Sequence, residues 1–511
     1  MGYRLISIKI PTNYSDAELR SAIKRELGIQ EFSYSIDGKS LDARRKSDIH
    51  WLLRVGVSSS ELKSGMPENK PEVEIPRKKR NKRILIAGSG PAGFFAAFFL
   101  QKAGFTTILL ERGKDVVSRA KGIEKFEKTG IFDSQANYAF GEGGAGTFSD
   151  GKLTSRSKHI SAERQFILNE YIKAGAPEEI AYMTHPHLGS DKLKLIVKNL
   201  RKEYEALGGS MLFETCLTGL ERKNGKILSA QTNGESFEAD FFIVAPGHSA
   251  YETYRMLMKS GVSFRPKGFA IGSRMEHPQQ IINMAQWGKA ELPGVKAAEY
   301  RLTANPDGAL PVYTFCMCPG GIVVPASAYE NTNIVNGMSL YRRDLKFANA
   351  ACVAAVDPFE LIGKNATAES VLDWMEALET KFYDYSGGYQ AAFSTISDFI
   401  KKKETSRIPE SSYPLGLKPA ALWELLPSKV SNSMRAGLQE FSRKIRGFET
   451  GIIMGLESKT SAPIQVLRDE ARNCSGFENL YLCGEGSGYA GGIISSAADG
   501  VKTAISICDR E

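Results

Sequence analysis

Three glycines early in the chain have the spacing that binds the pyrophosphate of a dinucleotide. They follow the apolar segment 83–87 and open a second apolar segment that runs to residue 103. In a strand–turn–helix unit, such glycines permit a tight turn, a close approach of backbone to pyrophosphate, and close packing of helix on strand. The free amides at the helix start attract the phosphates. The contacts expected at this turn are Gly88, Ser89, Gly90, Pro91, Ala92 and Gly93.

An acidic residue completes this unit. Glu111 ends the next apolar segment, 106–110, and follows Gly93 by 18 residues. An acid near this spacing accepts a hydrogen bond from a ribose hydroxyl and repels a 2′-phosphate, so NADP is disfavoured at this site. We include the neighbouring Arg112 among the expected cofactor contacts.

A second glycine-rich turn near the end of the chain indicates which dinucleotide binds. Segment 479–507 has the pattern of a strand, an acid, a glycine-rich turn and a helix. A helix that starts there directs its amides at a flavin ring and stabilises the anion formed on reduction. An NAD site needs one contiguous unit, whereas the longer FAD also needs distant strands, so the two turns together predict tightly but non-covalently bound FAD. The expected contacts are Gly484, Glu485, Gly488, Ala490, Gly491, Gly492 and Ile493, with Ala245 and Gly247 at the end of the apolar segment 241–244.

A glycine-dense segment, 138–156, is expected to form a further loop along the cofactor. Gly143, Gly144, Gly146 and Thr147 would face FAD with backbone or hydroxyl groups. Lys152 is a catalytic candidate that would face the flavin N5 atom or a carboxylated substrate. A surface lysine is an equally good interpretation of Lys152.

Two cysteines and four histidines are further candidates for chemistry. Cys316 and Cys318 would point to one face of a strand, where a dithiol could exchange electrons with flavin. Known flavin disulfide oxidoreductases use CxxC or CxxxxC spacing, so buried and unreactive thiols are the favoured alternative. Four histidines suit general acid catalysis, although His248, after a strand-ending glycine, is expected to cap a helix. The four are His185, His187, His248 and His277, and they have no metal-ligand spacing.

Composition argues against a disulfide-rich secreted protein and against a membrane-spanning protein. The chain has 511 residues, which predicts two or three domains, and seven cysteines without repeated CxxC pairs, which favours a reducing cytoplasm. It has no apolar run long enough to cross a membrane and no signal-peptide pattern. Its net charge is +8, and six positive charges lie in the segment 77–83. We interpret that segment as a solvated connector rather than a nucleic-acid contact.

The order of patterns predicts an α/β chain of three parts. Residues 1–75 form a small N-terminal α+β domain with its linker, in which Ser15 caps a helix that ends at Gly28. Residues 76–270 and 451–511 form an FAD-binding domain with a parallel sheet and a β meander. An α+β substrate domain, 271–450, interrupts them.

Together, these motifs resemble the FAD-dependent dehydrogenases of the glutathione-reductase-like flavoprotein superfamily, in a subgroup with an extra N-terminal domain. The resemblance covers nearly the whole chain and rests on segments 35–55, 88–97, 140–156, 185–193, 245–253, 274–279, 315–321, 335–339, 457–469 and 484–500. Segments 53–57, "LRVGV", and 335–339, "VNGMS", each differ from the usual pattern outside the inferred flavin contacts. The resemblance implies a glutathione-reductase-type FAD fold and an inserted substrate domain, and it implies no particular substrate.

The favoured function is an FAD-dependent oxidoreductase that transfers a hydride on an unidentified organic substrate. With a single GxGxxG motif, a reductant such as NAD(P)H would bind transiently at the flavin ring, or a protein would deliver the electrons. Two alternatives are a flavoprotein that binds RNA through residues 1–80, and a non-catalytic FAD-binding sensor. We expect a small-molecule substrate and no membrane or nucleic-acid partner; a homo-oligomer remains open.

Overall fold

Both glycine-rich turns follow strands of one five-stranded parallel sheet. The computed structural model describes residues 1–69 and 71–511 and orders this sheet β21-β10-β4-β5-β6. The strands are β4 (Arg83–Ala87), β5 (Thr106–Leu110), β6 (Ser210–Leu212), β10 (Phe241–Val244) and β21 (Leu480–Leu482). Because β10 lies between β4 and β21, the turns that follow these three strands meet at one edge of the sheet. Ligands of open parallel sheets bind at this carboxyl edge.

Each face of this sheet is covered, as the near-continuous apolar strands predicted. On one face, Ile84 and Ile86 pack against a layer of helices, whereas Leu85 points to the opposite face. The helices are α2 (Pro91–Lys102), α4 (Ser161–Lys173), α5 (Gly189–Ala206) and α13 (Ile493–Arg510). The opposite face packs on the predicted meander, which comprises β7 (Leu217–Lys223), β8 (Lys226–Thr232) and β9 (Ser236–Glu238). Helix α3 (Val116–Thr129) follows β5.

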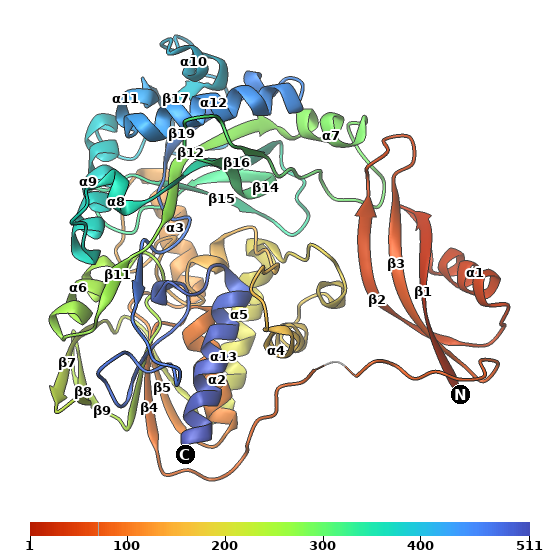
Figure 1. Cartoon of the computed structure of the whole chain (residues 1–511), viewed down its shortest axis with the longest axis horizontal. Helices are drawn as coiled ribbons and strands as arrows, with labels where there is room; N and C mark the ends of the chain where they lie inside the picture. Colours follow the sequence, from red (N-terminus) through yellow and green to blue (C-terminus); the bar gives the residue numbers. More distant parts are fainter. Residues whose placement is uncertain (70) are drawn as a thin grey trace.

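Helices α2 and α13, nearly 400 residues apart in sequence, lie side by side (Figure 1). Their closest approach uses Gly500, where an added Cβ would lie 2.0 Å from the carbonyl oxygen of Ala92. A second close approach occurs at Gly484, where an added Cβ would lie 2.5 Å from the Cβ of Ala92. The two glycine-rich motifs therefore contact each other directly at the start of α2.

A mixed eight-stranded sheet forms the second large part of the molecule. Its order is β13-β14-β16-β12-β19-β17-β18, and β15 pairs with β14. The strands are β12 (Phe269–Pro278), β13 (Thr303–Ala304), β14 (Val312–Pro325), β15 (Val335–Ser339), β16 (Phe347–Val356), β17 (Ala391–Thr395), β18 (Leu417–Pro419) and β19 (Ile452–Glu457). The associated helices are α6 (Tyr251–Lys259), α7 (Gln279–Trp287), α8 (Pro358–Leu361), α9 (Ala368–Ser386), α10 (Ile396–Lys401), α11 (Leu422–Leu425) and α12 (Ser428–Lys444). A short pair, β11 (Phe264–Pro266) with β20 (Ile464–Val466), lies at the junction with the parallel sheet.

The N-terminal residues form a separate small unit, visible at the right of Figure 1. Its sheet, β1-β3-β2, packs on helix α1 (Asp16–Leu27), which begins after the predicted cap Ser15 and ends at Gly28. The strands are β1 (Gly2–Pro11), β2 (Ser33–Asp42) and β3 (His50–Ser59). Lys39 joins this unit to the rest of the chain, because its amide donates to Tyr182 O at 2.8 Å and its carbonyl accepts from Thr184 N at 3.0 Å.

The basic segment 77–83 lies along the parallel-sheet part of the molecule. Arg80 is 8% exposed and stacks 4.7 Å from the centre of the Phe105 ring. Lys82 forms an ion pair with Asp240 at 3.1 Å, and the ammonium of Lys78 donates to the carbonyl oxygen of Glu511. These contacts support the interpretation of segment 77–83 as a connector, and they show that part of it packs on the parallel-sheet half of the molecule. Among residues 1–69 and 71–511, no helix has the length and apolar character that a membrane crossing needs.

The contact between α2 and α13 predicts the effect of Gly500→Ala. Helix propensity alone would make this change favourable by about 1 kcal/mol. The new methyl group would instead meet the Ala92 carbonyl, so we expect a net loss of about 1–3 kcal/mol in the free energy of unfolding. Urea denaturation measures this loss. The control is Gly234→Ala, where no described atom lies within 4 Å of an added Cβ, and equal stability of both variants would contradict the prediction.

Candidate functional site

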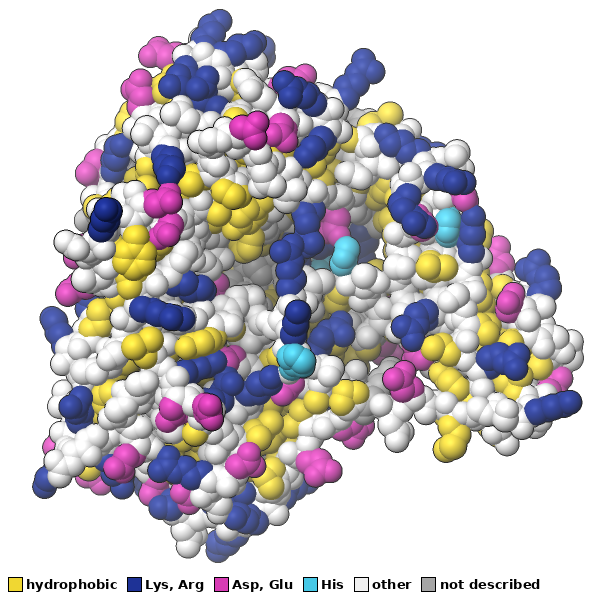
Figure 2. Space-filling model, viewed as in Figure 1, with side chains coloured by type: hydrophobic (Ala, Val, Ile, Leu, Met, Phe, Trp, Pro, Cys, Tyr) yellow, Lys and Arg dark blue, Asp and Glu magenta, His cyan; other side chains and the backbone are white. Residues whose placement is uncertain are grey.

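One elongated pocket joins the glycine-rich turns to the eight-stranded sheet. It contains about 1500 Å³ of empty space, part of it open to solvent. Figure 2 shows this side of the molecule hollowed near its centre, with Lys and Arg side chains along the rim. The predicted contacts that line the pocket are Gly88, Gly90, Pro91, Ala92, Glu111, Arg112, Gly144, Gly146, Lys152, Ala245, Gly247, Cys316, Gly484, Glu485, Gly492 and Ile493.

The first glycine turn leaves room for a phosphate group. Helix α2 begins at Gly90, and within the described chain no side chain caps its free amides. An ideal Cβ on Gly90 would have only the Cα of Gly144 within 4 Å among described atoms, at 3.7 Å. Uncapped amides at a helix start attract anions. The space that a side chain of residue 90 would fill therefore suits a pyrophosphate.

Glu111 joins three segments around this turn. Its Oε2 atom accepts from the amide and hydroxyl of Ser89, at 3.0 and 2.6 Å. Its Oε1 atom accepts from the amides of Gly113 and Gly141, at 2.9 and 3.0 Å. The carboxylate lines the pocket, but it is already bonded to four protein donors. That it also holds a ribose hydroxyl stays a prediction.

A buried arginine that the sequence analysis missed shapes the loop opposite Gly90. Arg119 is fully buried, and burial lowers its pKa to about 10. Its guanidinium donates to five backbone carbonyls, at 2.8–3.2 Å: those of Asn137, Tyr138, Gly141, Glu142 and Gly144. These five bonds fix the 137–144 segment, and Gly144 of this segment lies directly against Gly90, where an added Cβ on Gly144 would come within 2.9 Å of the Gly90 Cα.

Several predicted contacts do not line the pocket, and some of them make close packing contacts. An added Cβ on Gly93 would lie 1.9 Å from Gly88 O, and one on Gly488 would lie 2.5 Å from Ile464 O. The hydroxyl of Thr147 donates within its own loop, to Glu142 O at 3.4 Å. Their cofactor roles stay predictions, as do those of the other residues outside the pocket. The complete set is Ser89, Gly93, Gly143, Thr147, Gly488, Ala490, Gly491 and Cys318.

The C-terminal turn contributes the start of helix α13 and an acid. Gly492 precedes the helix with a φ of 85°, a left-handed conformation suited to glycine, and within the described residues no side chain caps it. Glu485 accepts a hydrogen bond from the amide of Gly492. Burial raises the pKa of Glu485 to about 7, although this hydrogen bond and Lys267 act in the opposite direction. The acid is therefore partly protonated near neutral pH.

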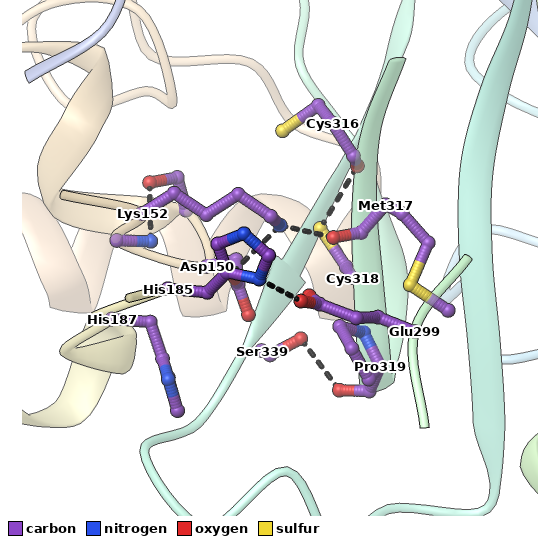
Figure 3. Close-up of polar contacts among 12 residues, drawn as sticks. Asp150, Lys152, His185, His187, Glu299, Cys316, Met317, Cys318, Pro319 and Ser339 are labelled. Atoms are coloured by element: carbon purple, nitrogen blue, oxygen red, sulfur yellow. Dashed lines mark hydrogen bonds and ion pairs between the residues drawn. The ribbon is translucent and has the colours of Figure 1, made fainter. Parts of the chain in front are cut away.

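At the other end of the pocket, Lys152 connects the FAD-binding half to strand β14 (Figure 3). Its ammonium donates to Asp150 Oδ2 at 2.8 Å and to the carbonyl oxygen of Met317. Burial lowers the pKa of Lys152, but the Asp150 carboxylate outweighs it, so the pKa lies above its ordinary value. Asp150 also receives two hydrogen bonds from Arg343, at 3.0 and 2.6 Å. Lys152 is thus a permanent cation in the pocket wall, not a surface lysine.

Strand β14 is irregular at the two cysteines, which corrects the prediction that they share one face of a regular strand. Phe315 pairs with Ala351 and Cys318 with Asn349, so β14 carries one residue more than β16 between these pairs. Cys316 has a φ of 43°, in the left-handed region. A β-bulge of this kind redirects side chains. As a result Cys316 lines the pocket, whereas Cys318 is fully buried behind it.

The electrostatics around Cys316 favour its thiolate. The neighbouring Cys318 thiol lowers the pKa of Cys316 below its ordinary value, with help from Lys152 and Arg274 and against burial and Asp150. Arg274 is itself fully buried and forms an ion pair with Glu457 at 2.9 Å. Neither residue was among the sequence predictions. The sequence could not predict this ion pair, because Arg274 and Glu457 are distant in the chain and come together only in the folded sheet.

His248 and Lys459 are two further pocket residues. His248 does not cap a helix as predicted, because α6 begins after Ala250 and the His248 Nδ1 atom lies 2.7 Å from Ser249 Oγ. Burial, together with Lys459, lowers the pKa of His248 to about 3, so its ring is neutral. Lys459 forms an ion pair with Glu379 at 2.7 Å. The other predicted histidines lie elsewhere: His185 beside Glu299, His187 at Tyr341 O, and His277 at Phe448 O.

Comparison with known proteins assigns a cofactor to this pocket. Residues 81–252 match the family described as FAD binding domain, and residues 268–460 match the family described as FAD-dependent protein, C-terminal domain-like. An uncharacterized protein of Clostridium beijerinckii (strain ATCC 51743 / NCIMB 8052) is 38% identical over 532 residues, which cover 100% of this chain and 99% of that protein. The pocket's two uncapped helix starts and its glycine cradle fit FAD, which is the cofactor.

Solved structures show more distant similarity. CtdE in complex with FAD is 12% identical, with coverage of 84% of each chain and a TM-score of 0.33. FqzB is also 12% identical, with coverage of 84% of this chain and 76% of its own and a TM-score of 0.38. Glycine oxidase from Bacillus cereus ATCC 14579 is 10% identical, covers 84% and 96%, and has a TM-score of 0.34.

The cradle at Gly90 predicts that Gly90→Val removes the cofactor without unfolding the chain. The new side chain would occupy the space for pyrophosphate rather than collide with protein atoms. We expect the purified variant to be colourless, with bound FAD reduced at least 10-fold by absorbance, and to keep the circular dichroism of the yellow parent protein. Gly234→Val, at an exposed turn, should keep its flavin. Full occupancy of the Gly90 variant would show that the phosphates bind elsewhere.

The raised pKa of Glu485 predicts a pH-dependent stability. Between its ordinary pKa of 4.5 and its folded pKa of about 7, the folded chain binds more protons than the unfolded chain. The free energy of unfolding should therefore fall as pH rises across this range, with a contribution of about 1–3 kcal/mol from this acid. Urea denaturation of flavin-free protein measures it, and Glu485→Gln should remove that part of the dependence. Identical pH profiles for both proteins would refute the assignment.

Proposed function

The chain belongs to the family of FAD-dependent proteins that includes the Clostridium beijerinckii relative, and we propose that it is an FAD-dependent oxidoreductase acting on a small organic substrate. We further propose that its FAD-binding half has the glutathione-reductase-type arrangement, with the eight-stranded sheet as the substrate domain. Bound FAD would supply the acceptor or donor of a hydride. A cytoplasmic location and a dehydrogenase direction are part of the proposal.

A single observation carries this function: the dinucleotide pocket ends at reactive side chains of the second sheet. The same cavity wall contains Gly90 at the phosphate end, and Lys152 and Cys316 at the far end. A purely structural cofactor would not need a thiol and a cation there. A non-catalytic sensor is therefore the weaker alternative.

Lys152 and His248 would have different roles toward a substrate. The raised pKa of Lys152 keeps its ammonium charged, so it would orient an anionic group or stabilise negative charge that develops during hydride transfer. The neutral ring of His248 would accept or donate a hydrogen bond without adding charge. Neither group suits a general base with a pKa near neutrality, which leaves Glu485 as the acid that can exchange a proton there.

The electron donor that we favour is a nicotinamide dinucleotide. With one GxGxxG motif in the sequence, we propose that it binds transiently at the flavin ring rather than in a domain of its own. The RNA-binding alternative would need the basic segment 77–83 to be free, but Lys82 is paired with Asp240 and Arg80 packs on Phe105. These contacts support a connector.

Anaerobic reduction of the bound flavin tests the function. We expect NADH or NADPH to bleach the flavin absorbance and an organic acceptor to restore it. Replacement of Lys152 by methionine removes its positive charge and should slow hydride transfer between the flavin and the substrate by about 100-fold. Lys121→Met, which changes an exposed lysine of α3, should have no effect. If the flavin shows no turnover with any donor, the enzyme proposal is wrong. If the two lysine variants behave alike, the role of Lys152 is wrong.

A further inference from the structure

The bulge in strand β14 places one cysteine on the flavin pocket and a second directly behind it. Cys316 lines the cavity shared with Glu485 and Ile493, whereas Cys318 has no exposed surface. Both are free thiols in the structure. We propose that Cys316 and Cys318 form a redox-active dithiol that exchanges two electrons with the bound FAD. This inference rests on the proposed function, because it requires a flavin that cycles between oxidised and reduced states.

The bulge places the Cys318 thiol against the backbone of Cys316. In a regular strand, residues two apart have Cα atoms separated by about 6.6 Å, at the upper end of the range that a disulfide spans. The left-handed φ of 43° at Cys316 interrupts the extended chain between the two cysteines. The Cys318 thiol donates to the Cys316 carbonyl oxygen at 3.3 Å, so it lies against the Cys316 backbone. Formation of the proposed disulfide would require the two side chains to rotate toward each other.

Two cations hold the bulge in this conformation: Lys152, which approaches Met317 in Figure 3, and Arg274. The residues of a bulge have carbonyl groups that leave the strand ladder. Here the Cys316 carbonyl accepts from Arg274 Nη1 at 3.2 Å, and the Met317 carbonyl accepts from Lys152. The Arg274 guanidinium is fixed in turn by Glu457, Asn349 and Asn336, at 2.9, 2.8 and 3.0 Å. A buried ion pair and two side-chain amides thus maintain a strained backbone beside the cofactor pocket.

The same cations favour the chemistry of a reactive thiol. Lys152 and Arg274 lower the pKa of Cys316, and a thiolate is the form that donates electrons to flavin or attacks a disulfide. By contrast, the buried Cys352 of the neighbouring strand has a raised pKa and lies away from the pocket wall. Inert buried cysteines therefore occur in the same sheet, and Cys316 differs from them in both position and charge.

The proposed exchange balances in atoms and electrons. In the reducing direction, the Cys316–Cys318 disulfide accepts two electrons and one proton from anionic reduced flavin. Its S–S bond breaks, Cys316 becomes a thiolate and Cys318 a thiol, while the flavin returns to its oxidised state. A nicotinamide dinucleotide, as proposed above, supplies the hydride that reduced the flavin. The reverse reaction forms the disulfide and reduces FAD.

An anaerobic dithionite titration of the FAD-bound protein tests the dithiol. Protein first oxidised with diamide should take up two more electrons per flavin than the Cys318→Ala variant treated in the same way. Alkylation under denaturing conditions, followed by mass spectrometry, should find Cys316 and Cys318 blocked in the oxidised parent protein and free after reduction. The matched control is Cys352→Ala, which should take up as many electrons as the parent.

A second variant keeps the test decisive if Cys318→Ala folds poorly. Cys316→Ser alters a residue at the pocket surface and should lose the same two electrons. The inference is overturned if parent and variants take up equal numbers of electrons, or if both thiols remain free after diamide treatment. A parent protein without a reducible flavin would instead refute the proposed function.

Discussion

The structure depends on a close contact between two helices, in which a glycine of α13 packs on the backbone of α2. Gly500 of α13 lies against the backbone of Ala92 in α2, where a Cβ would come within 2.0 Å of a carbonyl oxygen. This contact brings the C-terminal turn of the chain beside the first glycine turn, and the position of β10 between β4 and β21 aligns both with one sheet edge. A pocket for a long dinucleotide follows, because each turn contributes an uncapped helix start to the same cavity.

The second constraint is electrostatic and joins the two halves of the molecule. Asp150, in the glycine-rich loop, is bonded to Arg343 from the segment between β15 and β16 and to Lys152 beside it. Burial of one charge without a partner would cost several kcal/mol, so this group persists only as a set. It fixes the distance between the cofactor loop and strand β14. Paired buried charges therefore fix the part of the pocket near Lys152 and Cys316. At the phosphate-binding turns, glycines without side chains leave the space that the cofactor needs.

The strain at Cys316 shows how these constraints combine. A non-glycine residue in the left-handed region costs about 1–3 kcal/mol and persists only where its surroundings fix it. Here hydrogen bonds from Arg274 and Lys152 to consecutive carbonyls provide that restraint. The charges that position the backbone also act on the thiol, so geometry and reactivity have the same cause.

Local pattern was sufficient to predict much of this protein. The strands and helices around Gly88–Gly93, the Ser15 cap and the turns of the meander depend on neighbouring residues, and they form where predicted. Spacing also identified the two glycine-rich turns that line the pocket, because a phosphate-binding turn needs glycines in a fixed order. The FAD assignment, which rests on the pairing of these turns, agrees with the family match.

Tertiary structure alone decided which residues complete the site. Arg274 and Asp150 were not among the predicted site residues, and their roles arise from partners distant in the chain, Glu457 and Arg343. The bulge at Cys316 depends on the pairing of β14 with β16, which a period-two pattern cannot reveal. The sequence by itself indicated the cofactor and the glycine-rich turns that line its pocket, because those are local backbone requirements. The charges and thiols at the reactive end were decided by folding, because burial and long-range pairing set their positions and pKa values.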